Sequence, residues 1–470
     1  MIKQKLYSLY SSPYLWGALI AGTLLFNVFF LLGTKPISSW DEARHGVSAY
    51  EMLQSGNFVV NTYMGDFDYW NLKPPFAFYP MLAGFSLFGF TPFGLRFFSA
   101  VSTIVLFGIL FMFSNKIGGL RTARLACATL LSVEQFFLKH NARTGDADAF
   151  FGLLYFASVV VLLYHWRKPV ASYVAAFLAG MAFLTKSFHI IPLIPTIVII
   201  FFLQWGCSKQ SVMLFLRACL VGALPVVVWG LLRYQYDGFL FFITMIKVDV
   251  LNRSLTAVEG HGQPPLYYVA QVLKAFWPWL AATGLAYLAL LFLHKKSDVI
   301  ACWKSTITDK EKLLICLVVA AIMPIFFFSL SQSKLRWYSY PAFPFFALGI
   351  GYALHCALTC LKDHARVCFA LLTLVVTFGV VQEGVLLAHL MQAVNKRVPS
   401  QDFMEQLGTN KEMQGAVLFL QQGEWEQRDV LSSYFYGPFT LAPGGEAAFA
   451  ASNNPKKFLV PNEPTTDRER

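Results

Sequence analysis

The one long polar stretch in the first half of this sequence lies between residues 40 and 75, and ionisable side chains crowd into it. Four of them lie close together: Asp41, Glu42, Arg44 and His45. A further cation, Lys73, precedes two prolines, which exclude an ordinary helix at that point. Carboxylates and imidazoles can accept or donate protons, and cations can bind an anionic substrate. Ionisable groups collected beside a membrane-spanning segment generally serve function, so this stretch is the first candidate site.

The composition indicates what kind of protein must position these groups. Of the 470 residues, 56% are hydrophobic and only 13% are charged, whereas a soluble domain carries about 25% charged residues. The sequence therefore predicts a polytopic membrane protein. The net charge of +11 does not indicate a nucleic-acid partner, because the cations are spread over short loops between apolar runs.

Eleven apolar runs approach the length of about 20 residues that a membrane-spanning helix needs. They are 14–32, 93–113, 125–138, 149–164, 171–185, 190–205, 212–232, 268–293, 313–330, 341–361 and 367–390. Another run, 76–90, is short and is bounded by Gly and Pro, so we expect it to pack beside the membrane without crossing it. The predicted fold class is an all-α polytopic bundle with large outer loops and a small C-terminal extramembrane segment.

Charges in the loops give the bundle a direction. With the N-terminus in the cytoplasm, every predicted inner loop is rich in cations, and the two large acid-bearing loops, 33–92 and 233–267, lie outside. Residues 1–390 then form the transmembrane domain, and 391–470 form a small outer segment with strand-like runs. All eight cysteines fall in spans or on the inner side, so we expect no disulfide framework.

The polar stretch also carries an ordered set of short motifs. An Asp-Glu pair follows the first span, and the loop continues with Glu51-Met52-Leu53, Gly56-Asn57-Phe58-Val59-Val60 and Lys73-Pro74-Pro75. This set resembles the first outer loop of the GT-C class of lipid-linked sugar transferases. Within that class it is similar to the group of aminoarabinose lipid A transferases and protein O-mannosyltransferases. The resemblance extends over about residues 14–358 and implies a GT-C-like bundle of about eleven transmembrane helices.

The resemblance implies an inverting membrane glycosyltransferase that moves a sugar from an undecaprenyl or dolichyl phosphate carrier to an envelope acceptor. Lipid A or another glycolipid is favoured as the acceptor. The alternatives are an enzyme like the protein O-mannosyltransferases, or a transporter or flippase of lipid-linked saccharides. The protein would lie in a bacterial inner membrane, among membrane lipids, with its active site and C-terminus in the periplasm. A Walker pattern and a Ser-His-Asp signature, which would favour other chemistry, are missing from the sequence.

Two carboxylates are the expected catalytic groups. We expect Asp41 to take or orient a proton of the acceptor. Asp148, with Asp146 next to it, matches the acidic position of the family's second outer loop. Each acid could instead cap a helix, because Asp is a common N-cap residue and helical sequence follows. Glu42 is expected to be structural and paired with a cation.

Cations are expected to hold the donor phosphate: Arg44, Lys73, Lys186, Arg253 and Lys334. Lys186 ends a Leu-Thr-Lys sequence like that of the family. Lys334, with Tyr338, matches the family's Lys-Leu-x-x-Tyr-x-x-Pro segment. Alternatively, a cation at a membrane edge only extends its charged end to the membrane interface and binds no substrate.

The remaining site residues are expected on the acceptor side: His45, Asp146, His261 and Tyr338. No cofactor is certain. In the oligosaccharide-transferring members of the class, acids in these loops help to bind a divalent metal, and here Asp41, Asp148 and His261 are the candidate ligands. Leu72 stands where the aminoarabinose transferases have an acid before Lys-Pro-Pro, and this departure weakens the case for a metal.

Overall fold

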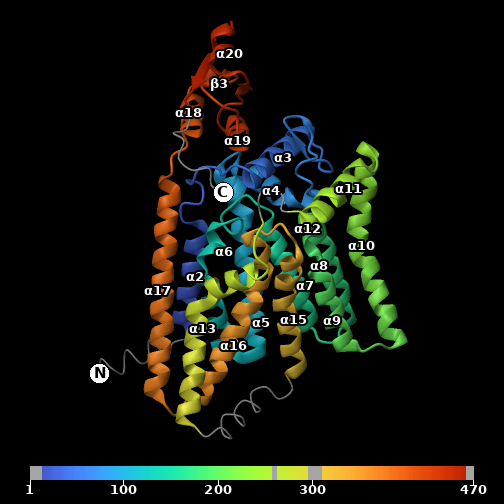
Figure 1. Cartoon of the computed structure of the whole chain (residues 1–470), viewed down its shortest axis with the longest axis vertical. Helices are drawn as coiled ribbons and strands as arrows, with labels where there is room; N and C mark the ends of the chain where they lie inside the picture. The colour runs from blue at the N-terminus through green and yellow to red at the C-terminus, as the bar shows by residue number, and fades with distance from the viewer. Residues whose placement is uncertain (1–12, 257–261, 295–309, 462–470) are drawn as a thin grey trace.

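Apolar runs of this length become helices because a membrane offers no partner for a free backbone N–H or C=O. The computed structural model describes residues 13–256, 262–294 and 310–461 (Figure 1). Within these residues, seven helices are long and apolar enough to cross a membrane, and shorter apolar helices pack among them. The chain is therefore an integral membrane protein with a mainly helical fold, as the sequence predicts.

Each predicted span coincides with a helix. These helices are α2 (Pro13–Phe29), α5 (Pro92–Leu131), α7 (Asp148–Tyr164), α8 (Pro169–Lys186), α9 (Leu193–Trp205), α10 (Lys209–Asp237), α13 (Tyr267–Leu293), α15 (Glu311–Leu330), α16 (Phe343–Cys360) and α17 (Ala365–Asn395). Helix α5 contains the span 93–113 and the first part of the span 125–138, with Gly119 interrupting it at a φ of 77°, whereas the rest of 125–138 lies in a separate short helix, α6 (Glu134–Leu138). A glycine adopts this conformation without the steric penalty that other residues meet.

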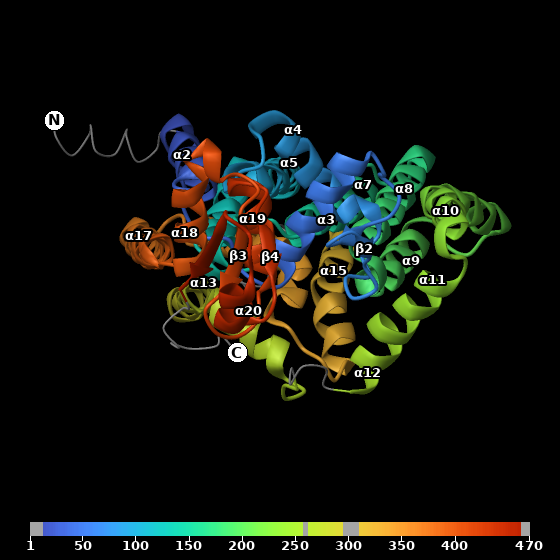
Figure 2. The same ribbon diagram turned by 90° about the horizontal axis from the view of Figure 1, so that it is seen from above.

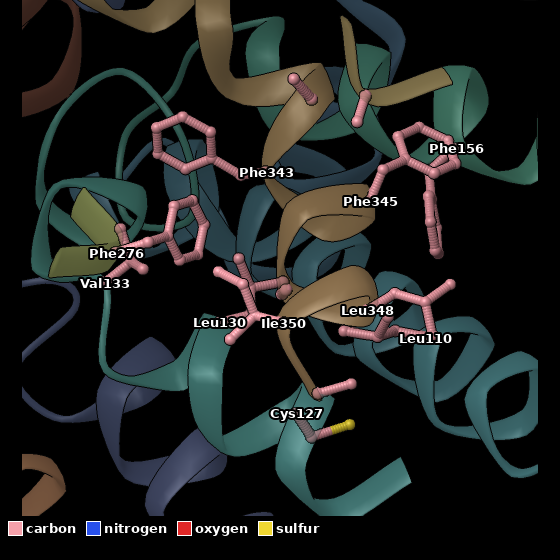
Figure 3. Close-up of a cluster of buried hydrophobic side chains, with 14 of the residues drawn as sticks. Leu110, Cys127, Leu130, Val133, Phe156, Phe276, Phe343, Phe345, Leu348 and Ile350 are labelled. Atoms are coloured by element: carbon pink, nitrogen blue, oxygen red, sulfur yellow. The ribbon is translucent and has the colours of Figure 1, made fainter. Parts of the chain in front are cut away.

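The core of the bundle lies where α16 packs against α5. A Cβ atom on Gly351 of α16 would lie 2.6 Å from the backbone nitrogen of Ala126 on α5, so only glycine permits this close approach. Large apolar side chains fill the space around the crossing (Figure 3): Leu110, Leu130, Phe276, Phe343, Phe345 and Leu348. This packing fixes the outer ends of the helices, from which the polar loops extend.

The first outer loop forms a compact layer over the bundle. It contains α3 (Asp41–Ser55), the antiparallel strands β1 (Thr62–Tyr63) and β2 (Asp66–Phe67), the short helix η1 (Pro75–Ala77) and α4 (Tyr79–Phe88). Helix α4 has ten residues and is therefore about 15 Å long, too short to cross a membrane of about 30 Å. This length agrees with the expectation that the run 76–90 does not cross.

Shorter elements complete the same end of the bundle. They are α6 (Glu134–Leu138), η2 (Ser187–Ile190), α11 (Leu240–Met245), the π-helix η3 (Ile246–Asn252), α12 (Arg253–Leu255) and η5 (Arg336–Ala342). From above, α11 and α12 lie at the outer edge of the molecule, well away from α17 (Figure 2).

The polar tail folds into a small unit, residues 399–460, which we call the C-terminal unit. It contains α18 (Pro399–Gly408), η6 (Lys411–Met413), β3 (Val417–Leu420), α19 (Gln427–Tyr436), β4 (Thr440–Ala442), α20 (Gly445–Ala451) and β5 (Lys457–Val460). The strands pair in parallel in the order β4-β3-β5. Two of these strands coincide with the strand-like runs of the sequence, whereas the parallel sheet and its helices were not predicted. The proposed domain boundary at residue 390 stays a prediction.

The C-terminal unit rests on α3 (Figures 1 and 2). A Cβ atom on Gly46 of α3 would lie 2.4 Å from a methyl group of Leu431 on α19, and the rings of Tyr50 and Tyr434 stack with centroids 4.6 Å apart. The Tyr434 hydroxyl donates a hydrogen bond of 3.0 Å to Glu51. The tail is therefore packed against the helix that begins with Asp41.

One cysteine departs from the sequence-based expectation. Cys360 is disulfide-bonded. The free cysteines of the described chain are Cys127, Cys207, Cys219, Cys316, Cys356 and Cys368. Residue spacing did not indicate the bond, because a disulfide depends on the distance between two segments in the folded chain.

Candidate active site at the outer end of the bundle

Asp41 is the first residue of α3, in the polar layer at one end of the bundle (Figure 1). The N-cap position belongs to Trp40, and α3 has no side-chain cap hydrogen bond. The suggestion that Asp41 caps its helix is therefore wrong. Its side chain is 37% exposed, so solvent reaches the carboxylate.

The next residue, Glu42, is structural, as expected. It is buried and accepts hydrogen bonds of 2.7 and 3.0 Å from the fully buried guanidinium of Arg96 on α5. It also accepts from the backbone N–H groups of Ser38, at 2.8 Å, and Gly145, at 2.9 Å. Although burial opposes ionisation, Arg96 holds the pKa of Glu42 below its ordinary value. This carboxylate ties α3, α5 and the second outer loop together directly behind Asp41.

Asp146 lies between two imidazoles. The distance from its carboxylate to Nδ1 of His140 is 3.2 Å and that to Nδ1 of His45 is 3.6 Å. The same nitrogen of His140 is 3.9 Å from the Asp41 carboxylate. Both Asp146 oxygens and the ring nitrogens of His45 are buried and have no aligned hydrogen bond. These polar atoms therefore lie close together but do not satisfy one another's hydrogen-bonding capacity.

In this group, the ionisation of each residue depends on the charges of its neighbours. Burial alone would raise the pKa of Asp146, but His140 and His45 hold it well below its ordinary range. For Asp41, burial is likewise outweighed by His45, His140 and the more distant Lys73, so its pKa is lowered. Burial would lower the pKa of His140, but Asp146 and Asp41 raise it above 6.5. Both acids are thus ionised near neutral pH.

The same group fits a divalent metal. Asp41, His140 and Asp146 each offer one ligand atom, and these atoms lie within 4.8 Å of one another. Two carboxylates and an imidazole suit Zn²⁺ and related ions, and the unpartnered buried atoms are those that a cation would satisfy. Of the predicted ligands, only Asp41 belongs to this set. Asp148 points elsewhere, and His261 lies outside the described residues.

Asp148 and Lys186 form a buried ion pair with each other. Asp148 is the first residue of α7, whose N-cap is Ala147 without a side-chain cap bond, so the capping alternative is wrong here also. The Lys186 charge is matched by this carboxylate. A catalytic role for Asp148 and a phosphate-binding role for Lys186 stay predictions.

The guanidinium of Arg44 is largely engaged in structure. Its Nε and Nη2 atoms donate bonds of 2.8 Å to Asp68, and Asp68 also accepts from the backbone N–H groups of Trp70 and Asn71. The pair therefore shapes the loop that leads to Lys73. Phosphate binding by Arg44 stays a prediction and would depend on its remaining N–H groups.

Arg253 lies among polar groups that sequence analysis did not connect. Its guanidinium is 3.4 Å from Asp249 and donates a bond of 3.3 Å to the hydroxyl of Tyr338. Asp249 accepts from Ser187 at 3.0 Å. The ring of Tyr338 lies 5.6 Å from the Lys186 ammonium, so the two predicted residues Arg253 and Tyr338 and the Asp148–Lys186 pair are neighbours.

Two of the predicted cations differ from the rest. Among the described residues, Lys73 and Lys334 form no ion pair, and Lys334 is buried. Lys73 is partly buried and close enough to Asp41 to influence its carboxyl group. A cation that forms no ion pair among the described residues, and that lies within electrostatic range of an accessible carboxylate, is suited to an anionic substrate.

His140 and Asp68 are site residues that sequence analysis missed. His140 has a positive φ of 50° and its ring stacks on Trp337 with centroids 3.6 Å apart. Its position as the first imidazole after the third span was the available signal. His45 and Asp146 were predicted to contact the acceptor, but both are almost fully buried behind Asp41. Direct acceptor contact by either residue stays a prediction.

Comparisons with known proteins agree with this picture. The sequence profile of the family described as dolichyl-phosphate-mannose-protein mannosyltransferase matches residues 72–229. An undecaprenyl phosphate-alpha-4-amino-4-deoxy-L-arabinose arabinosyl transferase of Pseudomonas fluorescens is 26% identical over 70% of this chain and 59% of its own length. The Shewanella sediminis protein of that name is 28% identical over 68% of this chain and 56% of its own length. The chain thus aligns with less than two thirds of these relatives.

Solved structures show the same fold. The crystal structure of ArnT from Cupriavidus metallidurans bound to undecaprenyl phosphate superposes with a TM-score of 0.68. The match has 19% sequence identity and covers 95% of this chain and 89% of the other. The apo structure of the same protein superposes with a TM-score of 0.66. At this identity the similarity shows a common fold, which includes the C-terminal unit because the match covers nearly the whole chain.

Proposed function

We propose, from the membership of this chain in the GT-C superfamily of membrane glycosyltransferases, that it is an inverting sugar transferase. Its donor would be a sugar on a polyprenyl phosphate, with undecaprenyl as the favoured carrier. Its acceptor would be an envelope glycolipid, with lipid A favoured. The printed names of the relatives support both assignments. The bundle would lie in a bacterial inner membrane with Asp41 on the periplasmic side.

The observation that carries this proposal is that Asp41, an accessible carboxylate, lies within electrostatic range of Lys73. Asp41 is ionised and accessible, and Lys73 is a cation without an ion-pair partner among the described residues. A base for a hydroxyl group and a site for a phosphate are the two groups that the reaction requires. Glu42 and Arg96 hold the helix that presents Asp41.

The reaction would proceed as a single displacement. The acceptor hydroxyl gives its proton to Asp41 as its oxygen forms a bond to the anomeric carbon of the sugar. The bond from that carbon to the carrier phosphate breaks, and the electron pair leaves with the phosphate, whose added charge Lys73 stabilises. One displacement inverts the anomeric configuration. A divalent ion held by Asp41, His140 and Asp146 would supply further positive charge at the site.

The alternatives differ in acceptor or in reaction. A protein acceptor is favoured by the description of the family profile that matches residues 72–229. A transporter would need free ionisable groups along a path through the membrane. Both acids of the predicted spans are instead engaged: Glu134, which the structure places at the start of α6, is 2.6 Å from Nδ1 of His389, and Glu383 accepts a bond of 3.2 Å from Asn27. This pairing favours the transferase.

Sugar transfer by purified protein tests the proposal. Wild-type protein, undecaprenyl phosphate-aminoarabinose and lipid A should yield lipid A heavier by one sugar in mass spectrometry. Asp41→Asn should fold normally but lose activity by about 10²–10⁴-fold with a hydroxyl acceptor, because general-base catalysis contributes that much, and by less with an acceptor phosphate, which is already ionised. Product at an undiminished rate from the Asn variant would remove Asp41 from the mechanism. Product with a protein acceptor, together with no product from a glycolipid, would favour the protein alternative.

A further inference from the structure

The residue before Asp41 has a backbone conformation that is ordinarily restricted to glycine. Trp40 has a φ of 64° and a ψ of −127°, which bring the Cβ of an L residue against its own backbone. Strain of this kind persists only where the surroundings enforce it, and it is typical of functional sites. It does not serve core packing here, because Trp40 is 55% exposed.

The C-terminal unit enforces this conformation. The Oε1 atom of Gln427, at the start of α19, accepts hydrogen bonds from the Ser39 hydroxyl at 2.9 Å and the Trp40 backbone N–H at 3.3 Å. The side-chain amide of Gln401, on α18, accepts from the N–H of Ile37 at 3.0 Å and donates to its C=O at 2.9 Å. Two amides from the end of the chain therefore fasten the segment that leads to Asp41.

Trp40 is part of an exposed aromatic surface. Its ring centroid is 6.1 Å from that of Trp70, which is 43% exposed. The guanidinium of Arg44 lies 4.6 Å from the Trp70 ring and is fixed by its two bonds to Asp68. The exposed indoles therefore lie next to a charged group, and Trp40 directly precedes Asp41, whose carboxylate is accessible.

We propose that Trp40 is an acceptor-binding residue whose indole stacks on a sugar ring of the acceptor and brings a hydroxyl group to Asp41. The proposal rests on the proposed function. A sugar ring presents a face of C–H groups that complements the electron-rich face of an aromatic ring, while its hydroxyl groups reach neighbouring charges. The C–H face would stack on the indole, and a hydroxyl group would reach the adjacent Asp41. A bare acyl chain would match only the indole.

The proposal gives the C-terminal unit a task in the reaction. Gln427 would be a positioning residue, because it contacts the backbone of Trp40 rather than the substrate. Its Oε1 atom only accepts hydrogen bonds, and a glutamate oxygen can replace it in that role. Gln427→Glu should therefore preserve acceptor use, whereas Gln427→Ala should weaken it.

Steady-state kinetics with lipid A and undecaprenyl phosphate-aminoarabinose test the proposal. Trp40→Gly removes the ring and relieves the strain, so the variant should melt no lower than wild type. Its KM for lipid A should nevertheless rise about three- to tenfold, the effect expected for one stacking contact, with the donor KM unchanged. Trp40→Phe keeps a ring and should restore most of the affinity. Trp277→Ala is the matched control, because Trp277 is equally exposed, at 53%, but lies on α13.

The outcomes separate this inference from the proposed function. An unchanged lipid A KM in an active Trp40→Gly variant would overturn the inference and leave the transferase intact. An equal rise in the donor KM would show a general loss of structure and would also overturn it. Failure of the wild-type protein to transfer sugar to any acceptor would overturn both.

Discussion

At the scale of single residues, the site contains charges that are already matched and charges that are not. Glu42, Asp148 and Arg44 each have an opposite charge within the protein. A matched pair contributes to structure and has little net charge to offer a substrate. Lys73 has no such partner among the described residues, and it is therefore the cation for which we expect the largest effect on donor binding.

Lys73→Met should raise the donor KM about ten- to hundredfold, because a charge-assisted hydrogen bond contributes about 1.5–3 kcal/mol. Methionine keeps the apolar part of the side chain, so folding should be preserved. Lys209→Met, at the exposed start of α10, is the matched control and should leave the donor KM unchanged. A normal donor KM in the Lys73 variant would show that this lysine only anchors the loop at the membrane interface.

The metal site can be tested by its ligands rather than by activity. Wild-type protein dialysed against Zn²⁺ should retain the ion, as measured by elemental mass spectrometry, whereas Asp146→Asn should bind it at least about tenfold more weakly. Asp148→Asn should retain it, because Asp148 pairs with Lys186. Binding should weaken as the pH falls through the raised pKa of His140, because protons compete for the imidazole. Equal Zn²⁺ retention by the wild type and the Asp146 variant would exclude this ligand set.

At the scale of elements, one buried ion pair determines how α3 sits on the bundle. Arg96 donates to both oxygens of Glu42 and to the backbone carbonyls of Leu32, Lys35 and Pro36. It therefore joins the end of the first span to α3 and α5. This arrangement holds Asp41 in place. Both charges of the pair are buried, so neither is presented at the surface.

Glu42→Gln should destabilise the protein by about 3–5 kcal/mol, because it leaves the buried Arg96 charge without its partner. Thermal unfolding in detergent would measure the loss. Asp402→Asn breaks an exposed pair with Arg397 instead and should change stability by less than about 1 kcal/mol. Similar melting temperatures for the two variants would contradict a structural role for Glu42.

At the scale of the whole molecule, the charge distribution predicts which side of the membrane each end occupies. A topology reporter fused after Asn395, at the end of α17, should indicate a periplasmic position. The same reporter fused after Arg121 should indicate a cytoplasmic position. The two positions carry opposite expectations from the same rule, so each is a control for the other. A cytoplasmic signal at Asn395 would reverse the orientation and place Asp41 on the wrong side for the proposed reaction.

The sequence by itself determined the class of fold and most of the spans. Apolar runs of membrane length form helices wherever they occur, because the membrane leaves the backbone no other way to satisfy its hydrogen bonds. The motif around Asp41 and Lys73 was likewise visible, since its residues lie within one loop. The Leu-Thr-Lys sequence predicted a site role for Lys186, and the polar content after residue 390 predicted an extramembrane segment; both stay predictions.

Only the tertiary structure decided which of these residues form ion pairs with one another and which do not. Sequence spacing does not show that Asp148 faces Lys186, that Asp146 faces His140, or that Arg44 is bound to Asp68, because each pair depends on helix packing rather than on local periodicity. The same holds for the contact of Gln427 with Trp40, which joins residues from opposite ends of the chain. Ion pairing and strain depend on distances in space, and those are fixed only when the bundle closes.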